Sequence, residues 1–218
     1  MEALIGIQFK DFVLLAADRM NMFSIIVVKH DVDKIHRLHD HLLMAVSGEP
    51  GDSIQFAEYI SKNIKLYRMR NGFDLSPASA AHFTQRNLAN YLRSRTPYHV
   101  NLLIGGYNTR TQEPSLYHMD YLATSVQVPF GVHGYGGSFV LGLLDRIYKA
   151  DCSVEEGIEM MKKCIAEIQK RLVINLPAFK LCMIDKNGHK DLPDISVEPI
   201  KIGDRFESRD QQVSPMVH

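Results

Sequence analysis

The 218-residue sequence has no net charge, no long apolar run and no set of cysteines that pair off evenly. Lysine plus arginine and aspartate plus glutamate number 25 each, which leaves no electrostatic reason to expect nucleic acid or an anionic membrane as a partner. Because no apolar run reaches about 18 residues, no membrane-spanning segment is predicted. Cys152, Cys164 and Cys182 lack CxxC spacing and leave one thiol over in any pairing, so we expect reduced thiols in a cytosolic setting.

Linkers, charge blocks and low-complexity tracts are also absent before residue 190. Since 45% of the residues are hydrophobic, the chain can bury one sizeable core, and residues 1–192 are predicted to form a single domain. Residues 193–218 combine prolines with scattered charge, which predicts an irregular C-terminal tail that is disordered or lies along a neighbour. Glu2 stands where a secretory signal peptide needs a basic flank, so no signal peptide is expected.

Apolar strands and amphipathic helices alternate along the rest of the chain. The order is strands, two helices, strands, two helices, strands, which predicts an α+β fold with two stacked sheets and a helix layer on each outer face. The hydrophobic periodicity places the helices at 50–70, from 77 to before Pro97, at 138–148 and at 153–172. Strands are predicted at 4–7, 12–17, 24–28, 41–47, 99–107, 115–120, 123–128, 130–133, 178–184 and from 189.

Residues at three of the predicted helix starts are suited to capping. Asp52 is the expected N-cap of the first helix, and Ser76, followed by Pro77, is that of the second. Ser153 and Glu156 have the spacing of a capping box, in which each side chain bonds the backbone N–H of the other residue.

Glycines cluster at two places that need an explanation. Gly105 and Gly106 interrupt a predicted strand, which indicates a bulge or the close approach of another backbone. The run from Gly134 to Gly137 precedes a helix, and helix N-termini bind phosphate, so a nucleotide-binding module is one hypothesis. The run lacks the Lys-Ser/Thr of a P-loop and the third glycine of a dinucleotide loop, which favours a turn that needs small residues for packing.

Four histidines, His30, His36, His39 and His41, lie close together in one polar segment. A metal site is one interpretation, but no cysteine joins them and their spacing is irregular. The favoured prediction is a solvated turn over residues 30–41, with no metal and no cofactor.

Asp18 ends a near-continuous apolar run over residues 12–17. A carboxylate beside a packed core needs a partner, because an unpaired buried charge is costly. Lys34, sixteen residues later, is the candidate partner. The pair serves either an active site or only the stability of the fold.

Several stretches of the sequence form a distinctive set. They are LIGIQFKDFVLLAADR at 4–19, Lys34, Ser47-Gly48, FTQRNLANYLRSRTPYHVNLLIGGY at 83–107, MDYLA at 119–123, HGYGG at 133–137 and MIDKNG at 183–188. Together they resemble the proteasome beta-subunit family, over nearly the whole chain up to about Leu192. The resemblance implies a four-layer α-β-β-α sandwich of the N-terminal-nucleophile hydrolase type. It also implies a place in a heteroheptameric ring of the 20S core particle, with other alpha and beta subunits as partners, in the cytoplasm and nucleus.

Catalytic members of this family are threonine proteases, and the resemblance assigns their site residues to positions in this sequence. The nucleophilic threonine corresponds to Glu2. The aspartate and lysine that set the electrostatics correspond to Asp18 and Lys34, and the glycine whose amide stabilises the oxyanion corresponds to Gly48. Three of these four residue types are therefore kept, and the nucleophile is not.

The other half of the family's site is replaced. The serine before the second helix pair corresponds to Tyr135, the second aspartate to Leu172 and its following serine to Asn175. No propeptide is expected before Glu2, and the first threonine in the chain is Thr84. The resemblance therefore implies a non-catalytic structural subunit, which supports ubiquitin-dependent protein degradation by neighbouring threonine-protease subunits.

Two further questions stay open at the level of sequence. The alternative function is a stand-alone hydrolase of the same fold with another nucleophile, such as Ser24 or Cys152, although neither has a recognisable His and Asp arrangement around it. Phe12, Phe23 and the segment 20–22 are either contact surfaces for neighbours or plain core and loop.

Overall fold

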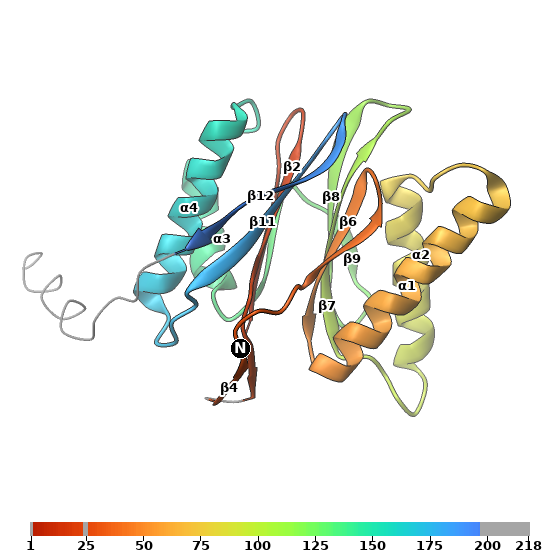
Figure 1. Ribbon diagram of the computed structural model, residues 1–218, viewed down its shortest axis with the longest axis horizontal. Helices are drawn as coiled ribbons and strands as arrows, with labels where there is room; N and C mark the ends of the chain where they lie inside the picture. The colour runs from red at the N-terminus through yellow and green to blue at the C-terminus, as the bar shows by residue number, and fades with distance from the viewer. Residues whose placement is uncertain (1, 24–25, 197–218) are drawn as a thin grey trace, which may run out of the picture.

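The computed structural model describes residues 2–23 and 26–196, and its centre consists of two five-stranded antiparallel sheets (Figure 1). In the first sheet, the N-terminal strands lie in the middle. Its order is β10 (Phe130–Gly134), β1 (Ala3–Gln8), β2 (Val13–Asp18), β11 (Ala178–Asp185) and β12 (Gly188–Ser196).

The second sheet follows chain order from one edge to the other. It contains β5 (Ile35–His39), β6 (Leu42–Gly48), β7 (Val100–Asn108), β8 (Glu113–Met119) and β9 (Ser125–Gln127). A separate two-stranded hairpin is formed by β3 (Asn21–Phe23) and β4 (Ile26–Lys29).

Helices cover both outer faces of the stacked sheets, and Figure 1 shows the four layers edge-on. On the second sheet lie α1 (Pro50–Asn71) and α2 (Pro77–Leu92), and on the first lie α3 (Gly137–Ile147) and α4 (Val154–Arg171). The predicted four-layer α-β-β-α sandwich is therefore confirmed. No helix in the described ranges is long and apolar enough to cross a membrane.

Strand β1 shows why its sequence is apolar at consecutive positions. Ala3, Ile5 and Ile7 pack in the core beneath α3 and α4, whereas Leu4 belongs to the core between the two sheets. Successive strand residues point to opposite faces, so a strand buried on both faces needs apolar side chains throughout.

The predicted caps are confirmed at two helices and wrong at one. Ser76 Oγ accepts a hydrogen bond from the Ser79 amide, and both bonds of the Ser153–Glu156 capping box are present. Helix α1 starts earlier than Asp52, because Pro50 occupies its first turn. The Asp52 carboxylate instead accepts a hydrogen bond from the His99 amide at 3.0 Å.

The predicted solvated turn over residues 30–41 is wrong, because the segment contains the edge strand β5. Ile35 and Leu38 are buried, and a register shift between Arg37 and His39 hides the alternation that would have revealed the strand. His39 Nε2 lies 3.1 Å from the Leu75 carbonyl oxygen. Within the described ranges, no three metal-ligating side chains come together.

Two smaller differences concern the glycine pair and the last strand. Gly105 and Gly106 stay in register in both ladders, so no bulge is present. Side chains, not another backbone, approach them closely: a Cβ on Gly106 would lie 2.7 Å from side-chain atoms of Leu42 and Pro77. Strand β12 runs to Ser196, so Pro193 to Ser196 are strand and not irregular tail. The rest of the predicted tail lies outside the described residues.

Candidate functional site

The Asp18 carboxylate, at the end of β2, is fully buried and held by hydrogen bonds on every side. Its Oδ1 accepts from the Ala3 amide at 2.8 Å and its Oδ2 from the Met20 amide at 3.1 Å. Lys34 Nζ donates to both oxygens, at 3.0 and 2.9 Å. Asp18 thereby ties the start of β1 to the end of β2.

The Lys34 ammonium lies one residue before β5 and is also buried. Besides Asp18, its Nζ bonds the Met20 carbonyl oxygen at 2.7 Å and lies 3.1 Å from Glu2 Oε1. Moving an ammonium out of water costs several kcal/mol unless its protons find acceptors, and here they do. The expected burial and pairing of Asp18 with Lys34 are thus observed.

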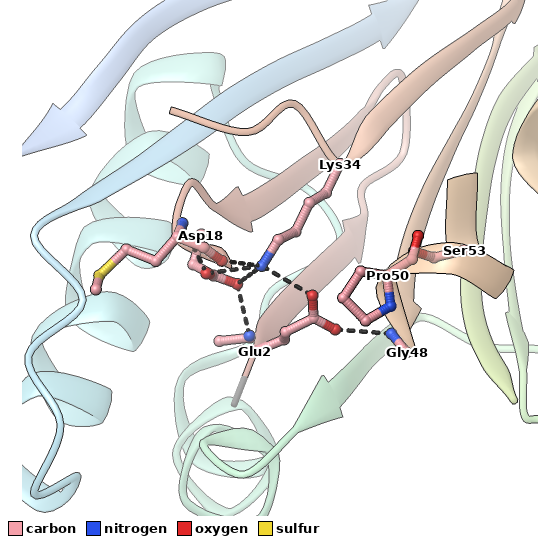
Figure 2. Close-up of polar contacts among 8 residues, drawn as sticks. Glu2, Asp18, Lys34, Gly48, Pro50 and Ser53 are labelled. Carbon is pink, nitrogen blue, oxygen red and sulfur yellow. Dashed lines mark hydrogen bonds and ion pairs between the residues drawn. The ribbon is translucent and has the colours of Figure 1, made fainter. Parts of the chain in front are cut away.

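Glu2 brings a second carboxylate to the same ammonium, as Figure 2 shows. Its Oε2 accepts a hydrogen bond from the Gly48 amide at 2.7 Å, so one side chain joins β6 to the Lys34 cluster. The backbone leaves little freedom here. Gly134 has φ +92°, and a Cβ there would lie 1.8 Å from the Glu2 carbonyl oxygen.

Gly48 has a geometric reason to be glycine. It ends β6 with φ +144°, and a Cβ would lie 2.1 Å from the His99 carbonyl oxygen. This conformation aims its N–H at Glu2, just before α1 begins at Pro50 (Figure 2). A helix N-terminus favours negative charge, which suits a cluster in which two carboxylates face one ammonium.

The chemistry available to this cluster is limited by Glu2. A carboxylate offers no hydroxyl nucleophile, and this one already accepts the hydrogen bond that the Gly48 amide can donate. The cavity beside Glu2 and Lys34 measures about 40 Å³. Ligand sites usually measure roughly 300–1,000 Å³, so this space does not admit a peptide side chain.

Larger cavities lie away from the cluster. One of about 310 Å³ opens between the α1–α2 connection and the β7–β8 turn, beside His39, Asp74 and Arg110. In this lining Ser76 Oγ lies 2.8 Å from Ser79 Oγ, and His39 bonds the Leu75 carbonyl oxygen and not a hydroxyl.

The three remaining predicted residues do not join the cluster. Tyr135 follows the strand residue that pairs with Ala3, but its side chain is 69% exposed. Leu172 caps α4, with its amide bonded to the Ile168 carbonyl oxygen at 2.7 Å. Asn175 Oδ1 is buried without a hydrogen-bond partner among the described residues. No hydrogen bond or ion pair in the described ranges connects any of the three to Glu2, Asp18 or Lys34.

Ala3 and Met20 are site residues that the sequence analysis missed, because they act through the backbone. The β1–β2 register contained a usable signal. Leu4 pairs with Ala17, which places Ala3 opposite Asp18. A reading of this hairpin register could have assigned the Ala3 amide to the carboxylate.

The alternative nucleophiles gain no support. Burial raises the pKa of the Cys152 thiol, as do the nearby Glu156 and Asp151, whereas a reactive cysteine needs a lowered pKa. Ser24 lies outside the described residues. The turn from Gly134 to Gly137 has a packing role, because a Cβ on Gly136 would lie 2.9 Å from Ile168.

The residues considered as contact surfaces are mostly core. Phe12 and Met20 are buried under the helices of the first sheet, and Met22 packs against the same cluster. The side chain of Phe23 lies outside the described part of the chain.

The fold consists of two stacked sheets between helix layers, and a buried aspartate and lysine lie beside the start of β1. These features define the N-terminal-nucleophile hydrolase class of folds. Comparison with known proteins narrows this class. A family model described as proteasome subunit matches residues 2–184. The chain belongs to the proteasome beta-subunit family.

Individual relatives agree with this assignment. The chain is 40% identical over 198 residues to proteasome subunit beta type-4 of Saccharomyces cerevisiae, covering 91% of this chain and 100% of the relative. It is 47% identical over 191 residues to proteasome subunit beta type-2-A of Arabidopsis thaliana, covering 88% and 93%. It is 45% identical over 191 residues to proteasome subunit beta type-2 of Oryza sativa, covering 88% and 89%. The chain is a non-catalytic beta subunit that assembles with other proteasome subunits.

Proposed function

We propose that this chain completes a seven-membered beta ring of the 20S core particle and that its Glu2 cluster is a catalytic pocket converted into a structural joint. The Glu2 carboxylate carries the proposal, because it stands at the nucleophile position and binds the Gly48 amide at 2.7 Å. Protein degradation is then done by threonine-protease neighbours in the stacked rings, in the cytoplasm and nucleus.

Exposed apolar side chains support a role inside an assembly. Isolated exposed hydrophobic residues are ordinary, but neighbouring ones favour burial against another chain, as do Ile26 and Val28 on one face of β4. The most exposed are Ile26 and Val28 on β4, Met69 on α1, Tyr135 before α3 and Val173 after α4.

Reaction with an electrophile specific for N-terminal threonine tests the proposal. Core particles are purified through a tag on this chain, treated with a β-lactone and separated into subunits for intact-mass measurement. We expect adducts on threonine-protease subunits, no adduct on this chain, and a native mass that fits seven-membered rings. An adduct on this chain, or recovery of the tagged chain without other proteasome subunits, would contradict the proposal.

A further inference from the structure

The two groups that hold the Glu2 carboxylate together form a binding site for a carboxylate. Its two oxygens have different partners: Oε1 faces the Lys34 ammonium at 3.1 Å, and Oε2 accepts from the Gly48 amide at 2.7 Å. Figure 2 shows the carboxylate between these two donors, beside Pro50 and Ser53 at the start of α1. This is two-point recognition of a carboxylate, with a charged donor on one oxygen and a rigid backbone donor on the other.

We propose that Lys34 and Gly48 form a receptor for a single small carboxylate, and that Glu2 is the tethered ligand that keeps it closed. The inference rests on the proposed function, since it explains how the former catalytic pocket is held shut. The donor that would otherwise hold the oxygen of a reacting carbonyl is occupied by the chain itself.

Both donors are held in place independently of Glu2. Lys34 is fixed by Asp18 and by the Met20 carbonyl oxygen, and Gly48 by its pairing with Val100 and its φ of +144°. Glu2→Ala should therefore leave the Lys34 ammonium and the Gly48 amide in place, without a carboxylate bound between them. The Glu2 carboxylate is part of the chain and loses little translational entropy when it binds the two donors. A free carboxylate loses more, so it binds only at a high concentration.

The available space limits the ligand to the smallest carboxylates. The cavity beside Glu2 measures about 40 Å³, and Glu2→Ala adds only the volume of the removed atoms. Formate and acetate should fit this enlarged space, whereas a peptide C-terminus should not.

Thermal unfolding of the full chain in sodium formate, sodium acetate or sodium chloride at equal ionic strength tests the receptor. For Glu2→Ala we expect formate and acetate to raise Tm by about 3–5 °C over chloride at about ten times the dissociation constant. Wild type and Glu2→Gln, whose receptor is filled, should show no difference between the salts. Glu49→Ala is the matched control, since Glu49 is exposed and its side chain makes no cap hydrogen bond. Intact mass establishes for every sample whether Met1 is present, and only samples with the same N-terminus are compared.

A second measurement locates the ligand. Formate should shift the NMR resonance of the Gly48 amide in Glu2→Ala and leave the Ala3 amide, which Asp18 holds, in place. If Glu2→Ala does not stay folded in chloride, the yield of folded chain after refolding in formate replaces Tm as the readout, and higher yield than in chloride is expected.

Equal Tm values, or equal refolding yields, in carboxylate and chloride would overturn the receptor. This failure is distinct from failure of the proposed function. A Glu2→Ala chain that ignores formate but still enters an active particle without reacting with the β-lactone leaves the structural role intact.

Discussion

The two halves of the predicted site are held in opposite ways. Asp18 and Lys34 are buried and bonded to each other and to backbone groups of Ala3 and Met20, and Lys34 also faces Glu2. Tyr135 is exposed, and Leu172 and Asn175 form no polar contact with the first half in the described ranges. The folded chain therefore depends on the first half and not on the second.

This difference separates the stabilising role of a residue from its catalytic role. Asp18 bonds the amides of Ala3 and Met20, so its loss would leave backbone donors unpaired in the core. No such penalty protects the positions at the start of α3 or the end of α4.

Replacing the lysine should produce the largest effect. Lys34→Met leaves Asp18 as a buried carboxylate without its ammonium, and we expect a loss of about 3–5 kcal/mol in the free energy of unfolding. Urea denaturation of the full chain measures it. Lys62→Met, which removes an exposed lysine paired with Glu58, is the control and should change stability by less than about 1 kcal/mol. A similar small change for Lys34→Met would contradict the comparison.

Lowering the pH should reduce the free energy of unfolding, because the ring of His133 is buried in the folded chain. His133 on β10 is buried, stacks on His118 at 4.0 Å and bonds the Leu102 carbonyl oxygen at 3.1 Å. Burial, and then His118, lower the pKa of His133 from 6.5 to about 4.

Because the unfolded chain then binds the proton more readily than the folded chain, stability should fall as the pH drops from about 6.5 towards about 4. We expect His133 to account for about 2 kcal/mol of loss between pH 7 and pH 5. His133→Gln isolates this contribution from that of the other histidines, and its stability should depend less on pH. Identical pH profiles for the two chains would refute it.

Neutralising Glu2 should have a smaller effect. Glu2→Gln keeps an acceptor for the Gly48 amide and removes only the charge facing Lys34, in a side chain that is 22% exposed. We expect a loss of about 1 kcal/mol in urea denaturation. Glu49→Gln should leave the stability unchanged, and a Glu2→Gln loss as large as that of Lys34→Met would place the second carboxylate among the essential parts of the cluster.

A serine at position 135 should have the smallest effect on the free energy of unfolding. Tyr135→Ser changes an exposed side chain and should alter stability by less than about 0.5 kcal/mol, without producing peptidase activity. Urea denaturation and a fluorogenic peptide assay measure the two effects. Activity that appears in this variant alone would show that the second half of the site is closer to function than its contacts indicate.

Much of the fold follows from local sequence patterns. The periodicity of α4 and its Ser153–Glu156 capping box identify that helix, and the continuous apolar run of β2 identifies a strand buried on both faces. Strand β5 was not predicted, because its histidines and its register shift mask the alternation of apolar and polar residues, although Ile35 and Leu38 are buried. Pairing with β6 at the edge of the second sheet, not local sequence, makes this segment a strand.

The site divides in the same way. Asp18 and Lys34 could be paired from sequence, because a carboxylate at the end of an apolar run needs a counter-charge. The role of Glu2 could not be predicted beyond the missing threonine, since its contact with Gly48 joins two strands that are far apart in the sequence. Side-chain bonds across such distances depend on the tertiary arrangement.

Amide hydrogen exchange at Gly48 and Ala3 tests most directly whether the Glu2 carboxylate occupies the Gly48 amide. In wild type both amides should exchange slowly, because Glu2 holds the first and Asp18 holds the second. In Glu2→Ala without added carboxylate, we expect exchange at Gly48 to be at least about tenfold faster and exchange at Ala3 to be unchanged. Equal exchange at Gly48 in the two chains would show that Glu2 does not occupy this donor.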